Sequence, residues 1–132
     1  MLSDRERAAT VDTIAAVQQP DGMIPWFAGG HADPWNHVEA AMALTVGGRV
    51  VESERAFGWL LATQRPDGAW HQYYAASGEV EVPLLDANVT AYVARGVWHH
   101  FLTTGDDGFL TTMWPAVDAA MGFVLRLQAP GG

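Results

Sequence analysis

A glutamate and two aspartates near the starts of two helical segments have side chains suited to acid–base chemistry. Glu39 falls in the second turn of a helix expected over residues 33–46. As a general acid or base, Glu39 would need a partner carboxylate several ångströms away, which Asp33 or Asp86 could supply. Both aspartates are equally suited to capping helix N-termini, where each would add ~1 kcal/mol of helix stability. Capping does not exclude ligand contact, so Glu39 and Asp86 are our candidate catalytic residues.

The histidines give no comparable signal for a metal. His31, Asp33 and His37 are ligand types for a divalent ion, but their spacing matches no established metal-binding motif. His99 and His100 fall near the C-terminal end of a helix expected over residues 86–104, where a structural role is favoured. We therefore expect no metal and no cofactor.

The six tryptophans offer flat apolar surfaces for a ligand. Trp26, Trp35 and Trp70 fall in or next to long connections, where they could stack on sugar rings or shape an isoprenoid pocket. The alternative is that they pin these connections to neighbouring helices. Trp98 and Trp114 lie inside apolar helical patterns and are expected to fill the core.

One loop sequence recurs three times. Residues 18–26, 64–70 and 128–132 each contain Gln-x-Pro-(Asp/Gly)-Gly after an apolar helical pattern. Proline just past a helix end, with glycine nearby, is a helix stop signal. Asp21 and Asp67 are expected to hydrogen-bond their own turn backbone. The repeat therefore predicts loops that end helices rather than loops that do chemistry.

The segments between these loops predict alternating outer and inner helices. Segments ending near residues 17, 63 and 127 are amphipathic, as expected of outer helices, and Ser3 with Glu6 forms a candidate capping box for the first. The Ala-rich segments at 33–46 and 86–104 are apolar on most faces, as expected of inner helices, and Val38 aligns with Val89. The longest connections lead into the N-termini of the inner helices, where backbone N–H groups favour anionic or hydroxyl-bearing ligands.

Composition limits the classes of partner. The chain has 132 residues, no Cys, no Lys and a formal charge of −8. The lack of Cys rules out disulfides and thiolate chemistry, and the lack of a basic cluster argues against nucleic acid. No apolar run approaches the ~20 residues of a spanning helix, so we expect one cytoplasmic domain with no membrane insertion.

Outer and inner helices joined by Gln-x-Pro-Asp-Gly loops with a following Trp resemble the α/α-toroid proteins. These include six-hairpin glycosidases and the terpenoid cyclases and prenyltransferases. Residues 94–128 resemble the glucoamylase and trehalase side of the group, and residues 64–70 resemble a loop motif of squalene-cyclase-like proteins. The resemblance implies an all-α fold in which residues 1–132 form one partial toroid of about five helices. Because such toroids close with six hairpins, the ring is incomplete, and the apolar flank would bind the remainder of the toroid or a second copy.

For function, the resemblance implies first a carbohydrate-active hydrolase. Its oligosaccharide would bind at the loop end of the inner helices, and a further catalytic carboxylate would fall beyond Gly132. The residues expected to bind substrate are Trp26, His31, Asp33, Trp35, His37, Trp70 and Asn88. A prenyltransferase- or cyclase-like protein is the second possibility, although the Asp-x-Asp-Asp and Asp-Asp-x-x-Asp motifs and the zinc-binding Cys are absent. A non-catalytic helical-repeat interaction module is the third.

Overall fold

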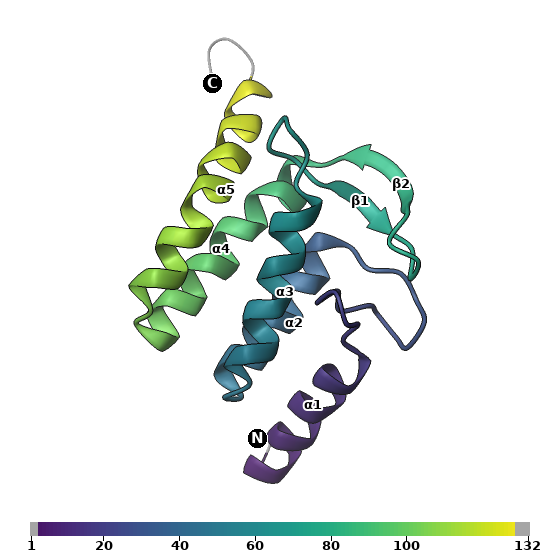
Figure 1. The fold of residues 1–132 in the computed structure, drawn as a ribbon, viewed down its shortest axis with the longest axis vertical. Helices are drawn as coiled ribbons and strands as arrows, with labels where there is room; N and C mark the ends of the chain where they lie inside the picture. The colour runs from purple at the N-terminus through teal and green to yellow at the C-terminus, as the bar shows by residue number, and fades with distance from the viewer. Residues whose placement is uncertain (1–2, 129–132) are drawn as a thin grey trace.

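The chain is an all-α protein with one small hairpin (Figure 1). A computed structural model describes residues 3–128, so the third repeated loop, 128–132, lies almost wholly outside the described residues. The five expected helices are all present, and two short strands lie in the connection between the third and the fourth. The elements are α1 (Asp4–Val17), α2 (Pro34–Val46), α3 (Val50–Thr63), β1 (His71–Tyr74), β2 (Val80–Leu85), α4 (Ala87–Thr104) and α5 (Asp107–Arg126).

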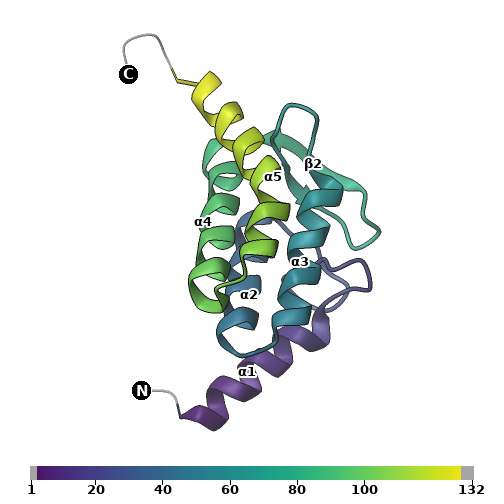
Figure 2. The ribbon, with the colours of Figure 1, turned by 60° about the vertical axis from the view of Figure 1, so that its left-hand side comes forward.

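The two Ala-rich helices form the inner layer. α2 and α4 pack against each other, α3 packs on α2, α5 packs on α4, and α1 contacts α2. Figure 1 shows α3 in front of α2, and Figure 2 shows α5 crossing diagonally beside α4. Phe57 of α3 is fully buried, and its ring packs against His100 of α4 and Phe109 of α5. The alternation of outer and inner helices expected from the sequence is thus confirmed for these five helices.

The inner helices run in the same direction. Trp35 of α2 stacks on Tyr92 of α4, and one turn later Val38 fills the space beside Gly96. The N-termini of α2 and α4 therefore lie at the same end of the protein. The alignment expected from the sequence is off by one position, because the buried residues Val38 and Ala41 of α2 match Thr90 and Val93 of α4.

The predicted helix caps are present. Ser3 and Glu6 form a reciprocal capping box at the start of α1. Asp33 caps α2 by accepting from the backbone N–H of Asn36, and Asp86 caps α4 by accepting from the N–H groups of Asn88 and Val89. Both aspartates thus fix where an inner helix begins.

The first two repeated loops are each fastened to the next outer helix by their glutamine. The Gln18 side-chain amide donates to the carbonyl of Glu52 in α3 at 2.8 Å. The Gln64 amide donates to the carbonyl of Ala116 in α5 at 2.9 Å. The repeated glutamine of the loop sequence therefore has a structural cause, because it forms the same bridge to an outer helix in both loops.

The aspartates of these loops stabilise the turn itself. Asp21 accepts from the backbone N–H of Met23, and Asp67 accepts from that of Ala69. This confirms their expected role as turn residues.

A β-hairpin, which we did not predict from the sequence, occupies part of the long connection before α4. β1 and β2 pair antiparallel with irregular register, and Tyr74 also bridges to Ala32, just before α2. The alternating apolar residues of "EVEVPLL" at 79–85 carry this strand signal. The hairpin ties the connection before α4 to the connection before α2, at the end of the protein where both inner helices begin (Figure 1).

Two tryptophans expected in the core lie on the surface. Trp98 of α4 is 54% exposed and Trp114 of α5 is 58% exposed. Each sits in an apolar helical pattern, but on the face that no described neighbour covers. Leu102 and Leu125, also exposed, extend the apolar surface of the same two helices.

The expectation that no segment approaches a membrane span is wrong for α5. By length and composition α5 meets the criteria for a spanning helix, the one helix of the described part that does so. A core helix of a soluble protein meets the same criteria. Met113, Val117 and Ala120 of α5 are buried inside the protein, where the helix packs on α4.

Candidate functional site

The exposed face of the inner helices carries a cluster of aromatic and polar side chains. We call it the inner-face cluster; its members are Trp35, Glu39, Asn88, Tyr92 and Arg95. The first two come from the first two turns of α2, and the others lie on one stripe of α4. Trp35, Glu39, Asn88 and Tyr92 lie in the first two turns of their helices, as expected for Trp35, Glu39 and Asn88, and Arg95 follows near the middle of α4.

The aromatic pair is the organising contact of this cluster. The Trp35 and Tyr92 rings are stacked, with centroids 4.1 Å apart and an interplanar angle of 8°. Trp35 remains 38% exposed. A flat, partly exposed indole held by stacking presents a rigid apolar surface of the kind on which a sugar ring packs.

Glu39 is held by the same tyrosine. The Tyr92 hydroxyl donates to Glu39 Oε1, and this hydrogen bond is the main reason that the pKa of Tyr92 is raised. The nearby Arg95 guanidinium acts in the opposite direction on the pKa of Tyr92. Glu39 is exposed, so its carboxylate is fixed in place yet open to a ligand.

Tyr92 and Arg95 are site residues that sequence reasoning missed. They follow Asn88 at steps of four and three residues, which places all three on one helix face. Polar side chains at helical spacing in an otherwise apolar inner helix were the available signal.

Asp33 is too heavily hydrogen-bonded to partner Glu39 as a free carboxylate. Its side chain is nearly buried, at 5% exposure for the residue. Oδ1 accepts from the Asn36 backbone, and Oδ2 accepts from the Trp26 indole at 2.6 Å and from the Asn36 side chain at 2.8 Å. Asp33 therefore fastens the first long loop to α2 in addition to capping that helix.

The Asp86 carboxylate accepts fewer hydrogen bonds than that of Asp33. One oxygen, Oδ1, accepts both capping hydrogen bonds, and the residue is half-buried beside the exposed Asn88. Catalytic roles for Asp86 and Glu39 remain predictions.

His37 is a core residue, which corrects its expected place among the substrate contacts. It is fully buried. Nδ1 accepts from the Ile24 backbone N–H at 3.1 Å, which leaves Nε2 to donate to the Ala56 carbonyl at 2.8 Å. Both ring nitrogens are thus used to connect the first loop and α3 to α2.

Burial lowers the pKa of His37 to about 4, although hydrogen bonding to Ala56 and the charges of Asp33 and Asp21 oppose the shift. A neutral imidazole is also what the Ile24 hydrogen bond requires. Since the folded state binds this proton more weakly than the unfolded chain, stability is complete above pH 6.5 and is lost as the pH falls toward 4. The full effect is roughly 3 kcal/mol.

Urea unfolding at pH 7 and pH 4.5 tests this prediction. His37→Gln is the matched control, because its amide can accept from Ile24 and donate to Ala56 without titrating. We expect the wild type to lose more stability than the variant on acidification. Equal losses would show that His37 does not control acid stability.

Trp70 also lies in the core, contrary to its predicted contact with substrate. It is fully buried, and its indole N–H donates to the Leu60 carbonyl at 2.9 Å. In the two loops Trp70 matches Ile24 rather than Trp26, because the first loop has two extra residues before its tryptophan. The second loop therefore contributes a structural brace and no exposed indole.

A second aromatic group surrounds His31 in the loops. The ring centroid of His31 lies 4.9 Å from that of Trp26 and 4.8 Å from that of Tyr73. Its Nδ1 lies 2.9 Å from Glu81 Oε2. Trp26 and Phe27 are more than half exposed. Trp26 and His31 thus lie at the loop end of the protein, as expected. Their ring contacts are with loop residues such as Tyr73 rather than with Glu39.

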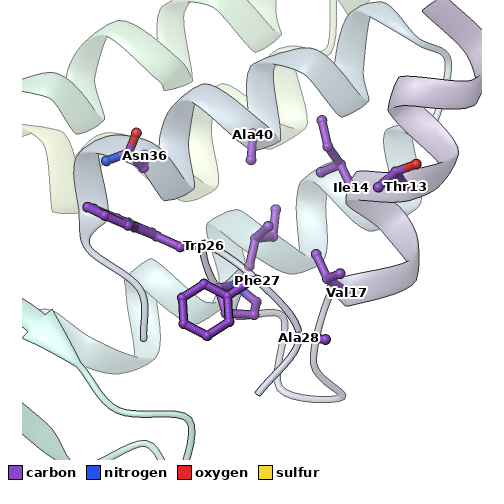
Figure 3. A pocket seen from close by; sticks show the side chains of 10 residues that line it. Thr13, Ile14, Val17, Trp26, Phe27, Ala28, Asn36 and Ala40 are labelled. Atoms are coloured by element: carbon purple, nitrogen blue, oxygen red, sulfur yellow. The ribbon is translucent and has the colours of Figure 1, made fainter. Parts of the chain in front are cut away.

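Two grooves flank α1. The first has a volume of about 560 Å³ and is lined mainly by apolar residues of α1, α2 and the first loop. Figure 3 shows Ile14 and Val17 of α1 on one side of it, and Trp26 and Phe27 on the other. The second groove, also of about 560 Å³, lies on the other side of α1, and Glu39 is one of its lining residues.

Metal chemistry gains no support from the geometry. Within residues 3–128, no group of three or more His, Asp and Glu side chains is placed to hold an ion. His31 and His37 are kept apart by their separate partners, Glu81 and the Ala56 carbonyl.

Fold and site together define an all-α helical-hairpin protein with an aromatic and carboxylate surface on its inner helices. No known family model matches the chain. Over all 132 residues the chain is 51% identical to a protein of Mycolicibacterium hassiacum, the MMP endo-(1,4)-3-O-methyl-alpha-D-mannosidase. The chain spans 36% of the length of that relative. The homologue is thus a carbohydrate-acting hydrolase, as expected for the glycosidase branch of the resemblance.

Proposed function

We propose that this chain forms the substrate-binding inner face of a glycoside hydrolase that acts on α-(1,4)-linked, O-methylated mannosides. The observation that carries this proposal is the 51% identity, along the whole chain, to a mannosidase of that specificity. The inner-face cluster supports it, because a stacked indole, a fixed carboxylate and a guanidinium are the groups that bind a sugar ring and its hydroxyls.

In this proposal each residue of the cluster has a separate role. Trp35 stacks on the apolar face of a mannosyl ring, and Arg95 and Asn88 donate hydrogen bonds to its oxygens. Glu39 exchanges a proton with the glycosidic oxygen or with the attacking water. Tyr92 is a positioning residue, because it touches Glu39 and Trp35 and fixes both.

The partner carboxylate is the open part of the mechanism. Glycosidases use two carboxyl groups about 5–10 Å apart, and their separation decides whether the anomeric configuration is retained or inverted. Among the described residues Asp86 is our candidate, since the oxygens of Asp33 already accept three hydrogen bonds.

We further propose that the five helices belong to an α/α toroid whose other hairpins cover the exposed apolar side chains of α4 and α5. Gln18 and Gln64 each follow an outer helix and bind the next one. Gln128 follows α5 in the same way, so it is suited to bind a further outer helix. Trp98 and Trp114 would then become buried.

Replacing Trp35 with Ala tests the proposed sugar site. We expect at least a tenfold weaker affinity for an α-(1,4)-linked 3-O-methylmannose oligosaccharide, because the stacking surface is lost. Isothermal titration calorimetry measures this affinity. Phe27→Ala is the control, since Phe27 is an exposed aromatic side chain outside the cluster. Equal affinity of wild type and Trp35→Ala would contradict the proposal.

A further inference from the structure

The groove beside Glu39 has a mainly apolar surface that glycoside hydrolysis alone does not explain. Its residues come from α1, from α2 and from His99 of α4, and they include the polar side chains of Asp4, Arg7 and Thr10. Its apolar lining includes Ala8, Val11, Met42, Ala43 and Val46. Hydroxyl groups of an ordinary sugar would lose hydrogen bonds to water against such a surface.

This groove continues directly from the inner-face cluster. Glu39 lines the groove and also accepts the hydrogen bond of Tyr92, whose ring stacks on Trp35. Met42 and Val46 lie about one and two helical turns beyond Glu39 on α2. A sugar chain that reaches Glu39 from Trp35 therefore meets the apolar residues next.

The groove on the other side of α1 has no such connection. It has the same volume of about 560 Å³, but Glu39 is absent from its lining. Of these two grooves, the one lined by Glu39 is therefore placed to contact the substituents of a sugar bound at the cluster.

Resting on the proposed function, we propose that the groove lined by Val11, Met42 and Val46 selects O-methylated over unmethylated mannosides. A methyl ether has no donor to leave unpaired and adds a methyl group that gains by leaving water. Each methyl group buried there is expected to strengthen binding about fourfold. These three residues are thus specificity-determining residues, and Trp35 supplies the binding common to both sugars.

Val46→Thr and Val51→Thr form a matched pair for the test. Each makes the same nearly isosteric change at a residue that is 69% exposed, but Val51 on α3 lies outside the groove. Met42→Gln is a second test variant, with a polar side chain of similar length. The dissociation constants for α-(1,4)-linked oligosaccharides of 3-O-methylmannose and of mannose are measured by titration calorimetry.

We expect Val46→Thr and Met42→Gln to reduce the preference for the methylated sugar about two- to fourfold, mainly through weaker binding of the methylated sugar. Val51→Thr should keep the wild-type preference. A preference unchanged in both groove variants, with binding still dependent on Trp35, would overturn the selectivity of this groove but leave the proposed function intact. Binding that is absent, or independent of Trp35, would overturn both.

Discussion

Replacing Gly68 with Ala is expected to lower the free energy of unfolding by about 3 kcal/mol or more. Gly68 has φ = +92°, a conformation that L side chains rarely adopt. A Cβ atom there would lie 2.1 Å from the carbonyl oxygen of Ala119 in α5. Since that oxygen belongs to helix backbone, the clash can be relieved only by moving the loop away from α5, which also weakens the Gln64 bridge to Ala116.

Thermal unfolding followed by circular dichroism measures this effect, which we expect to be a fall of about 10 °C in Tm. Gly58→Ala is the control, because Gly58 lies inside α3 with no atom close to the added methyl group. Alanine there should leave stability unchanged or raise it by up to about 1 kcal/mol. A Gly68→Ala protein as stable as wild type would show that the loop does not need this close approach.

Replacing Glu39 with Gln is expected to reduce kcat/KM for hydrolysis of the α-(1,4)-linked methylmannoside by about 10²- to 10⁴-fold. The amide cannot exchange a proton with the glycosidic oxygen, but it can still accept the hydrogen bond of Tyr92. Because Glu39 is exposed, the fold should be unaffected. Substrate affinity should change far less than turnover, since Trp35 remains in place.

Asp86→Asn separates the capping role of Asp86 from a catalytic one. Asparagine caps helices about as well as aspartate, so the stability of α4 should be retained. If Asp86 is the partner carboxylate, activity falls although the protein remains folded. Full activity in both Glu39→Gln and Asp86→Asn would remove these residues from the catalytic set.

The fold could be predicted largely from local signals. Asp33 and Asp86 marked the starts of the inner helices, and the Gln-x-Pro-Asp-Gly loops marked the ends of outer ones. These signals depend on hydrogen bonds between residues a few positions apart, so the local residue types are enough to predict them. The positions of helices and loops therefore followed without any tertiary information.

The site was predicted only in part, because side-chain exposure depends on packing between distant segments. Trp70 and His37 have residue types that bind ligands, but the Leu60 and Ala56 carbonyls of α3 engage them in the core. Conversely, Tyr92 became a site residue only through α2, which places Trp35 and Glu39 against it. Helical spacing places Tyr92 on one face with Asn88 and Arg95, but it does not predict contacts between distant segments.

The most direct test of the proposed sugar site is a ¹H–¹⁵N NMR titration of the protein with an α-(1,4)-linked 3-O-methylmannose oligosaccharide. We predict saturable shift changes at the indole N–H of Trp35 and the backbone amides of Glu39 and Tyr92. The indole signal of Trp26, in the loop aromatic group, should change little. Changes confined to Trp26 and His31, or no saturable changes at all, would contradict a sugar site on the inner helices.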